Sequence, residues 1–427
     1  MKYFSPQLVV FALVVFALVL AVQGQDAVTS LAGQPQVPGA LNGPGTNALF
    51  NQPAGLVIAA NGTVYVADSA NHAIRAIATN GVVTTFAGQL GVPGSQDGPG
   101  TNAQFFAPSA LALDGNGNLL VSDTGNATLR RITPVGAVTT LAGLAGQPGF
   151  ADGPAASAQF GAPLGLAVAT NGAIYVADGG NHLIRVLTGG SVSTFAGTPG
   201  VWGTANGLGT NAQFNAPCGL AFAPSGNLFV SDANNDTIRQ ITPSGQVTTY
   251  AGTPGVDGTN DGPAATAKFC RPAELAFDPA HNLIVADSFN HTLRQISPNG
   301  FVTTISGKAG NYSSAAGLNG AGRYFNPYGL AFNTNGLLLV ADTYNQMIRQ
   351  VLVPFQATLQ LAGHPPTITL TWPAVVGQKY QVQYTTSLTG TWTNLSAVLT
   401  ATAHTLSQTD LLNPAQPQRH YRVVLRP

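Results

Sequence analysis

The chain has 427 residues, of which only 7% are charged, and its 16 lysines and arginines balance its 16 aspartates and glutamates. This balance excludes a strong electrostatic field, so we expect no binding of nucleic acid or of an anionic membrane surface. With 51 glycines, 29 prolines and 44% hydrophobic residues, the composition is too apolar for a disordered chain and favours many short strands joined by turns. We therefore expect an all-β fold.

Residues 1–24 are expected to form a secretory signal peptide. Lys2 gives the segment a basic start, and the apolar stretch from Leu8 to Val22 ends in small residues, as such peptides do. An uncleaved membrane anchor is the alternative, but the stretch is shorter than the roughly 20 residues that span a bilayer. We therefore expect an exported protein, extracellular, periplasmic or on the cell surface, with no membrane span after signal removal.

A repeated pattern fills residues 27–353. Each of its six copies has an aspartate at the end of an apolar strand and an arginine seven residues later, and successive aspartates are 54 or 55 residues apart. The pairs are Asp68 and Arg75, Asp123 and Arg130, Asp178 and Arg185, Asp232 and Arg239, Asp287 and Arg294, and Asp342 and Arg349. A period of this length predicts a propeller or a solenoid. Each copy also contains turn residues that separate four strands, which is the content of one propeller blade.

The repeated pattern resembles the NHL repeat, because Asn181, His182 and Leu183 reproduce the Asn-His-Leu tripeptide that gives this family its name. The resemblance implies a six-bladed β-propeller over residues 25–353. It leaves the activity open, because the family includes protein-binding, RNA-binding and enzymatic members.

The two ends of the repeat region complement each other. A strand with the pattern of the outermost strand of a blade occurs at residues 27–33, before the first complete blade, and is missing after the sixth. We therefore expect residues 28–32 to complete blade six beside residues 347–353 and to close the ring, which removes an exposed sheet edge.

The repeat ends near Phe355, and residues 354–427 are expected to form a small β-sandwich. Alternating strands are predicted at 367–372, 379–384, 391–395 and 420–425. The segment resembles the fibronectin type III-like modules of exported bacterial proteins. Trp372, Tyr380, Trp392 and Tyr421 could form a sugar-stacking surface, but aromatic residues more often fill the core of such a domain.

The aspartates and arginines of the repeat are expected to be structural. The aspartate can accept hydrogen bonds from backbone N–H groups of the next turn, and the arginine can bind carboxylate or carbonyl groups. A catalytic pair would not need six copies. Cys218 and Cys270 are the only cysteines, so we expect no disulfide framework.

Three histidines raise the question of a metal. His72, His182 and His291 occupy equivalent positions in blades one, three and five, but zinc ligands must converge to about 2 Å from one atom, and these residues belong to separate blades. Asp-Gly pairs in the long loops, such as Asp97-Gly98, could hold calcium, although turn formation explains them. We predict no cofactor, with calcium or zinc as the alternatives.

Blade five breaks the repeat at its inner strand. The other blades have glycine or alanine at one position, whereas blade five has Glu274, the only glutamate of the chain. Because the common fold does not demand this change, we expect a ligand site at the upper mouth of the channel, near blades four to six. Its candidate residues are Trp202, Cys218, Lys268, Cys270, Arg271, Glu274 and Tyr328. The alternative is that Glu274 only forms an ion pair with Arg271.

No known catalytic motif occurs in the chain. We therefore expect a binding scaffold rather than an enzyme, with a protein, peptide or glycan bound on the face that carries the longest loops. The alternative comes from the resemblance to propeller lyases and is a metal-dependent lyase or hydrolase with its site at the channel mouth.

Overall fold

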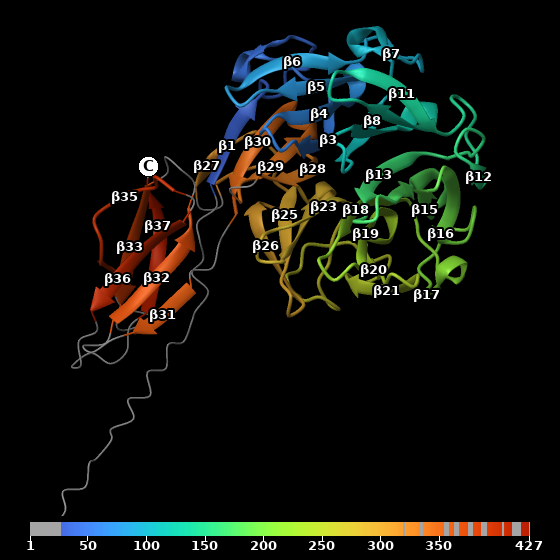
Figure 1. Ribbon diagram of the computed structural model, residues 1–427. Coiled ribbons are helices and arrows are strands. Elements are labelled where there is room, and N and C mark those ends of the chain that lie inside the picture. Colours follow the sequence, from blue (N-terminus) through green and yellow to red (C-terminus); the bar gives the residue numbers. More distant parts are fainter. Residues whose placement is uncertain are drawn as a thin grey trace, which may run out of the picture. The chain divides into compact units, whose positions relative to one another are not determined.

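The computed structural model describes residues 27–318, 321–333, 336–353, 358–362, 367–374, 379–385, 391–403, 405–411 and 420–426 (Figure 1). Contacts divide the chain into two compact units, of which one spans Asp26–Val353 and the other contains Pro354–Pro427. The predicted signal peptide lies outside the described residues. Within the described ranges, no helix is long and apolar enough to cross a membrane.

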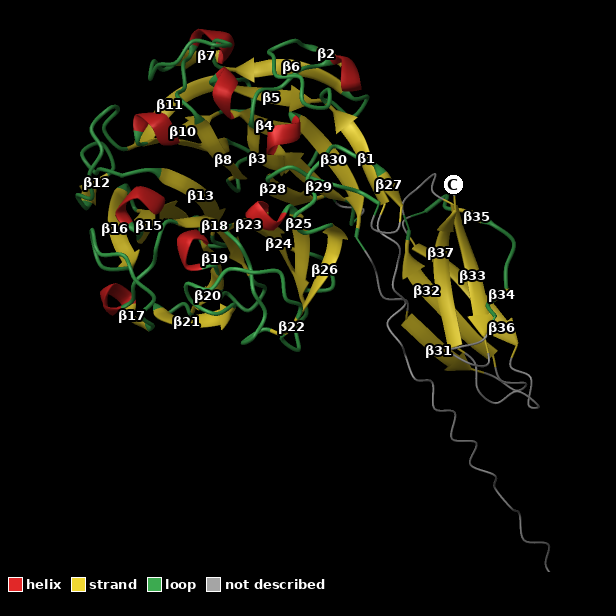
Figure 2. Cartoon of the chain, turned by 180° about the vertical axis from the view of Figure 1, so that it is seen from behind, coloured by secondary structure: helices red, strands yellow, loops and turns green. Residues whose placement is uncertain are grey.

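The first unit is a propeller of six antiparallel sheets, each with five strands, and the inner strands of consecutive blades contact one another around a central axis (Figure 2). From the channel outwards, blade one contains β3 (Pro53–Ile58), β4 (Val64–Asp68), β5 (Ala73–Ile77), β6 (Val82–Ala87) and β2 (Gly43–Pro44). Blade two contains β8 (Pro108–Leu113), β9 (Leu119–Asp123), β10 (Thr128–Ile132), β11 (Ala137–Ala142) and β7 (Gly98–Pro99). Blade three contains β13 (Pro163–Val168), β14 (Ile174–Asp178), β15 (Leu183–Thr188), β16 (Ser191–Ala196) and β12 (Gly153–Pro154).

The second half of the ring follows the same order. Blade four contains β18 (Pro217–Phe222), β19 (Leu228–Asp232), β20 (Thr237–Ile241), β21 (Gln246–Ala251) and β17 (Gly207–Leu208). Blade five contains β23 (Pro272–Phe277), β24 (Leu283–Asp287), β25 (Thr292–Ile296), β26 (Phe301–Gly307) and β22 (Gly262–Pro263). Blade six contains β28 (Pro327–Phe332), β29 (Leu338–Asp342), β30 (Met347–Leu352), β1 (Ala27–Ala32) and β27 (Gly317–Leu318).

One-turn 3-10 helices mark one end of the propeller, which we call the upper face. They follow the second strand of every blade: η2 (Ser69–Asn71), η4 (Thr124–Asn126), η5 (Gly179–Asn181), η7 (Ala233–Asn235), η8 (Ser288–Asn290) and η9 (Thr343–Asn345). Among the described residues, three more lie in the long loops that connect blades: η1 (Gly45–Asn47), η3 (Gly100–Asn102) and η6 (Gly209–Asn211). Each helix of the first group ends in a residue with a left-handed backbone, such as His72 at φ 56°.

The core lies between blades rather than within one blade. The second strands are apolar almost throughout because neighbouring blades cover both of their faces, and in β4 only Tyr65 is not fully buried. One core cluster combines Leu56 and Val66 of blade one with Leu339 and Ala341 of blade six. The blades therefore stabilise one another as a ring.

Each blade has one strand more than the repeat predicts. The fifth strand has two residues and pairs with the outermost long strand, as Gly43 does with Val83 in blade one. The prediction of four strands was incomplete, because a pair of residues inside an irregular loop carries no periodic signal.

The predicted closure of the ring is confirmed. Strand β1 pairs antiparallel with β30, with Val28 opposite Val351, and Val28 is buried. Blade six also contacts blade one directly, because the hydroxyl of Thr343 donates a hydrogen bond of 2.8 Å to the backbone oxygen of Pro53.

The described residues of the second unit form two sheets. One consists of β31 (Thr358–Ala362), β32 (Thr367–Pro373) and β36 (Thr405–Leu411). The other consists of β34 (Thr393–Asn394), β33 (Lys379–Thr385), β35 (Leu399–Thr400) and β37 (His420–Arg426). Trp372 and Tyr380, one from each sheet, are buried with 6.3 Å between their ring centroids. These two rings therefore belong to the core and not to a sugar-stacking surface, and β31, β35 and β36 were not predicted.

Candidate binding sites at the channel and the upper face

The aspartate and arginine of each repeat lie inside their blade, as blade one shows. The Oδ2 atom of Asp68 accepts hydrogen bonds from Nη1 of Arg75 at 2.7 Å and from Nδ2 of Asn71 at 2.8 Å. Its Oδ1 atom accepts a bond of 2.7 Å from the backbone N–H of Asn51. The Arg75 guanidinium lies over the ring of Phe50, with 5.2 Å between Cζ and the ring centroid. Buried charges need such partners. Asp68 and Arg75 therefore connect strands β4 and β5 to the loop that precedes β3.

A second aspartate, in the long loop that connects blades, also binds the repeat arginine in blades two, three and five. Oδ1 of Asp97 accepts a hydrogen bond of 2.6 Å from the second terminal nitrogen of Arg130, and the same contact recurs in blades three and five. Asn42 replaces the aspartate in blade one and accepts a bond of 2.7 Å from Arg75. Turn formation alone, the interpretation from sequence, misses this ion pair, because its two members are 33 residues apart in the chain.

The three histidines connect neighbouring blades. In each, Nδ1 accepts a hydrogen bond from a backbone N–H group of the next blade. The pairs are His72 with Ala107 at 3.2 Å, His182 with Ala216 at 3.0 Å and His291 with Asn326 at 3.2 Å. Burial lowers the pKa of all three imidazoles, which favours the neutral form that can accept this bond.

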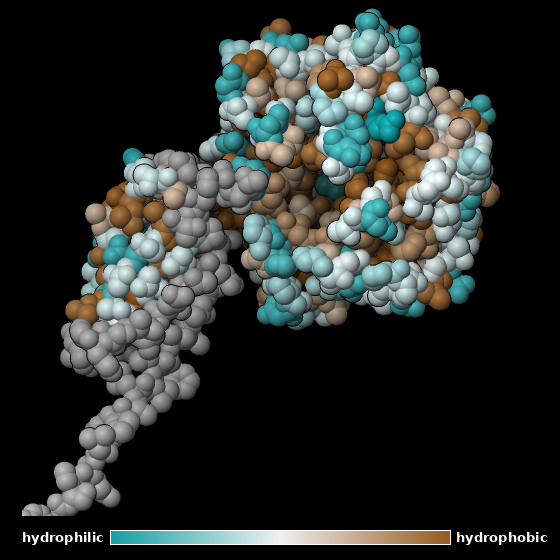
Figure 3. All heavy atoms as spheres, viewed as in Figure 1, coloured by the Kyte–Doolittle hydropathy of each residue, from teal (hydrophilic) through white to brown (hydrophobic). Residues whose placement is uncertain are grey.

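The central channel contains a cavity of about 360 Å³ that is lined mainly by apolar side chains. Leucines from all six inner strands line it, namely Leu56, Leu111, Leu166, Leu220, Leu275 and Leu330. Figure 3 shows hydrophobic atoms, in brown, around the hollow at the centre of the propeller. Glu274 is the only charged residue among the described residues that line this cavity.

Close contact between inner strands explains why most blades have glycine at the position of Glu274. A Cβ atom on Gly219 would lie 2.3 Å from the backbone oxygen of Ala273, and one on Gly329 would lie 2.3 Å from that of Ala54. In blade five the side chain instead faces the cavity. The Glu274 carboxylate accepts hydrogen bonds from two backbone N–H groups, those of Leu275 at 3.3 Å and of Leu220. Burial raises its pKa to about 7.

The alternative interpretation of Glu274, an ion pair with Arg271, is wrong. The guanidinium of Arg271 lies over the ring of Phe289, with 4.8 Å between Cζ and the ring centroid. Its backbone N–H donates a bond of 2.8 Å to Asp236, at a left-handed φ of 46°. Cation–π contact with an exposed ring therefore directs the guanidinium away from the glutamate.

Cys218 and Tyr328 lie next to Glu274. The Cys218 Sγ atom and the Tyr328 hydroxyl form a hydrogen bond of 2.9 Å. Burial, reinforced by the charge of Glu274, raises the pKa of Cys218 to about 12 and that of Tyr328 well above 10. Burial likewise raises the pKa of Cys270 to about 11. Because the thiolate is the reactive form, neither cysteine is an activated nucleophile.

The remaining candidates have different surroundings. Trp202 is 67% exposed and forms a bridge with Phe214 in a long upper loop. The backbone oxygen of Lys268 accepts a hydrogen bond of 2.8 Å from Arg294. The contacts thus bring Cys218, Glu274 and Tyr328 together in the channel and join neither Trp202 nor Lys268 to them.

Sequence reasoning missed a group of rings on the upper face at blades five and six. This upper aromatic cluster consists of His291, Tyr312, Phe325 and Tyr344. Tyr312 stacks on Phe325 with 4.5 Å between centroids, and Tyr344 meets Phe325 edge-on at 5.1 Å. Tyr312 is 57% exposed and Tyr344 42%. The repeat contained a signal for it, because the turn position of Tyr344 has alanine, glycine or asparagine in blades one to four.

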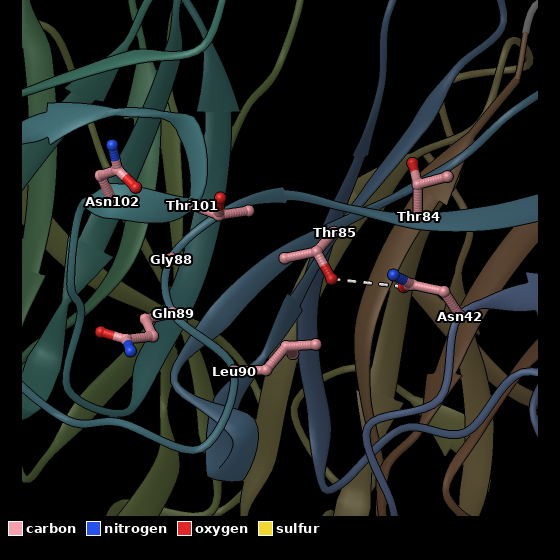
Figure 4. Close-up of a pocket in the computed structure, with 8 residues that line it drawn as sticks. All are labelled: Asn42, Thr84, Thr85, Gly88, Gln89, Leu90, Thr101 and Asn102. Carbon is pink, nitrogen blue, oxygen red and sulfur yellow. Dashed lines mark hydrogen bonds between the residues drawn. The ribbon is translucent and has the colours of Figure 1, made fainter.

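A second, polar pocket of about 590 Å³ lies beside the outer strand of blade one and the first long loop of blade two (Figure 4). Its lining residues are Asn42, Thr84, Thr85, Gly88, Gln89, Leu90, Thr101 and Asn102. The Thr85 hydroxyl donates a hydrogen bond of 3.2 Å to Asn42. This lining offers neutral hydrogen-bonding groups and no ionisable side chain.

Comparisons with known proteins agree with this fold. A model of the NHL repeat matches residues 50–77 and 160–187. "NHL repeat-containing protein 2" of Homo sapiens is 29% identical over 320 residues, which make up 66% of this chain and 44% of that protein. The chain therefore spans less than half of this relative.

Two solved structures share the propeller fold. A protein of unknown function from Bacteroides thetaiotaomicron has a TM-score of 0.61 at 20% identity, and an auxiliary nutrient binding protein from Bacteroides ovatus has a TM-score of 0.59 at 16% identity. In both comparisons, 77% of this chain and 76% of the other chain are covered.

Proposed function

From the premise that this chain carries an NHL-repeat propeller, we propose that it is a binding scaffold whose upper aromatic cluster recognises a protein, peptide or glycan. The observation that carries the proposal is the exposure of Tyr312 and Tyr344 above a stacked ring. The propeller fold does not need large rings there, since four blades have small or polar residues at the Tyr344 position. Aromatic residues are enriched where proteins bind partners.

Other features support binding as the general role. The high pKa values of Cys218 and Cys270 keep both thiols protonated at neutral pH. The auxiliary nutrient binding protein of similar fold shows that a propeller of this kind occurs in a protein named for binding. We further propose that the protein acts outside the cytoplasm, because of the apolar segment that precedes the propeller.

The test is binding of the purified protein to arrays of neutral glycans and of peptides. Combined Tyr312→Ala and Tyr344→Ala substitutions should weaken binding of the ligand found there by about tenfold or more, which is about 1.4 kcal/mol. Phe301→Ala is the matched control, because Phe301 is 47% exposed and begins β26, at the end of blade five opposite to η8. Unchanged affinity in the tyrosine variant would place the ligand elsewhere. Stoichiometric zinc or calcium together with turnover would favour the lyase or hydrolase alternative.

A further inference from the structure

The carboxylate of Glu274 is a charged group in an apolar channel. Among the described residues that line the cavity it is the only charged one, and the hydrogen bonds that it accepts come from the neutral backbone N–H groups of Leu220 and Leu275. The ion pairs found in the described part of the chain all join arginine to aspartate. A buried carboxylate is normally paired with a cation, so this position is suited to a positive charge supplied from outside the protein.

The neighbouring side chains do not supply that charge. The nearest ionisable groups on the adjoining inner strands, the Cys218 thiol on β18 and the Tyr328 hydroxyl on β28, are neutral and bonded to each other. Arg271, the nearest arginine in the sequence, is engaged with Phe289. The potential at this end of the cavity is therefore negative and would stabilise a cation.

The cavity has the size and lining for a small ligand. Its volume of about 360 Å³ lies within the roughly 300–1,000 Å³ that is usual for ligand pockets. At about 30 Å³ for a water-sized group, it holds about a dozen non-hydrogen atoms. Aliphatic side chains surround this space on every blade, so the body of the ligand should be apolar.

We propose that the channel binds a small organic cation, an alkylammonium whose apolar body packs against the leucines and whose charged nitrogen contacts Glu274. The site differs in position and chemistry from the upper aromatic cluster. An apolar body alone would gain from burial, whereas the carboxylate adds a preference for positive charge over neutral and negative charge.

The test uses probes of equal apolar length. Hexylamine, hexanol and hexanoate are titrated into the full propeller-containing protein at pH 8 by calorimetry. We expect hexylamine to bind at least about tenfold more tightly than hexanol, and hexanoate to bind most weakly. Glu274→Gln should remove this preference and leave hexanol binding unchanged. Asp257→Asn, which removes a carboxylate from an exposed loop position, should leave the preference intact.

A second variant tests whether the probes enter the channel. Ala331→Phe fills the cavity from β28, and Ala331 lines it in the structure. This variant should lose hexylamine and hexanol binding together, while its thermal unfolding reports whether it is folded. Equal affinity for amine and alcohol in the unaltered protein, an amine preference that survives Glu274→Gln, or amine binding that survives Ala331→Phe would each overturn the proposal.

Discussion

At the scale of single residues, the left-handed position after the 3-10 helix has a side-chain hydrogen-bond acceptor in five of the six blades, and this acceptor need not be a histidine; blade two has Ala127 there. Nδ1 of His72, His182 and His291 accepts a backbone N–H of the next blade. In blade four Oδ1 of Asp236 takes the same role at 2.8 Å, and in blade six Oε1 of Gln346 does so at 2.6 Å. The backbone is left-handed at all five positions, and asparagine and histidine tolerate this conformation better than most residues.

Replacing the three histidines together by asparagine should therefore remove an acid sensitivity. Burial lowers the pKa of each imidazole from 6.5, so the unfolded chain binds more protons and stability falls as the pH drops below about 6.5. Asparagine places Oδ1 at the site of Nδ1 and does not titrate. Between pH 8 and pH 5, unfolding by denaturant should show a larger loss of stability in the unaltered protein than in the variant. Equal losses would contradict this role of the histidines.

Glu274 should have the opposite pH dependence. Its pKa is raised from 4.5 to about 7, so the folded state binds more protons and the stability that this group contributes is lost as the pH rises from about 4.5 through 7. Glu274→Gln should be more stable than the unaltered protein at pH 8, by roughly 1 to 3 kcal/mol, and equal to it near pH 4. Unfolding curves of the two proteins at both pH values give the difference in unfolding free energy. Since all other titrating groups are shared, a change in this difference with pH reports on residue 274 alone. A constant difference across this range would show that the carboxyl does not titrate there.

At the scale of the strand and its loop, the repeat arginine of a blade can bind two carboxylates that differ in burial and therefore in their contribution to stability. Asp123, fully buried, and Asp97, with a side chain that is 47% exposed, both bind Arg130. Blade six has Ala316 at the loop position, and there Arg349 keeps only the backbone part of this contact, a bond of 2.9 Å to the oxygen of Ala315 that matches the bond of 3.1 Å from Arg130 to Gln96. The fold therefore tolerates loss of the loop carboxylate.

We expect Asp97→Ala to cost about 1 kcal/mol or less, the range of exposed ion pairs. Asp123→Ala should cost about 3 to 5 kcal/mol, because it leaves the buried guanidinium of Arg130 without its inner carboxylate. Chemical unfolding of both variants measures the difference. The converse substitution Ala316→Asp in blade six should not destabilise the protein. If the two alanine variants lost similar amounts of unfolding free energy, burial of the carboxylate would not determine how much each contact contributes.

Strands and loops also differ in how far the sequence predicts them. The six strand–turn–strand units have a fixed period, so their number and order followed from spacing. The ring followed from the resemblance to the NHL repeat, and its closure by residues 28–32 from an outer-strand pattern that precedes the first blade and is missing after the sixth. Contacts such as Asp97 with Arg130 join residues 33 positions apart, and no local pattern encodes them. Glu274 was found because it breaks a repeat, and Tyr344 breaks another position of the repeat in the same way. Tyr312 lies at a loop position that varies among the other blades, which have proline, tryptophan or aspartate there, so no constant residue exists from which it departs.

At the scale of the whole molecule, closure of the ring depends on β1. Val28 and Ala32 of this strand are buried in the clusters that join blade six to its two neighbours. The backbone oxygen of Thr29 also accepts a hydrogen bond of 3.4 Å from Arg349. Because each blade covers the face of the next one, loss of this strand should affect the stability of the entire propeller.

Deletion of residues 25–33 should therefore lower the melting temperature of the propeller as a unit. The deletion exposes the edge of β30 and the apolar surface beneath Val28 and Ala32. At about 1.5 to 3 kcal/mol for one buried valine and about 1 kcal/mol for each lost hydrogen bond, the cost should exceed about 3 kcal/mol. Deletion of residues 25 and 26 alone is the matched control, since it leaves β1 intact. An unchanged melting temperature after the longer deletion would mean that blade six is stable without its fourth strand, and that contacts between β28 and β3 suffice to hold the ring closed.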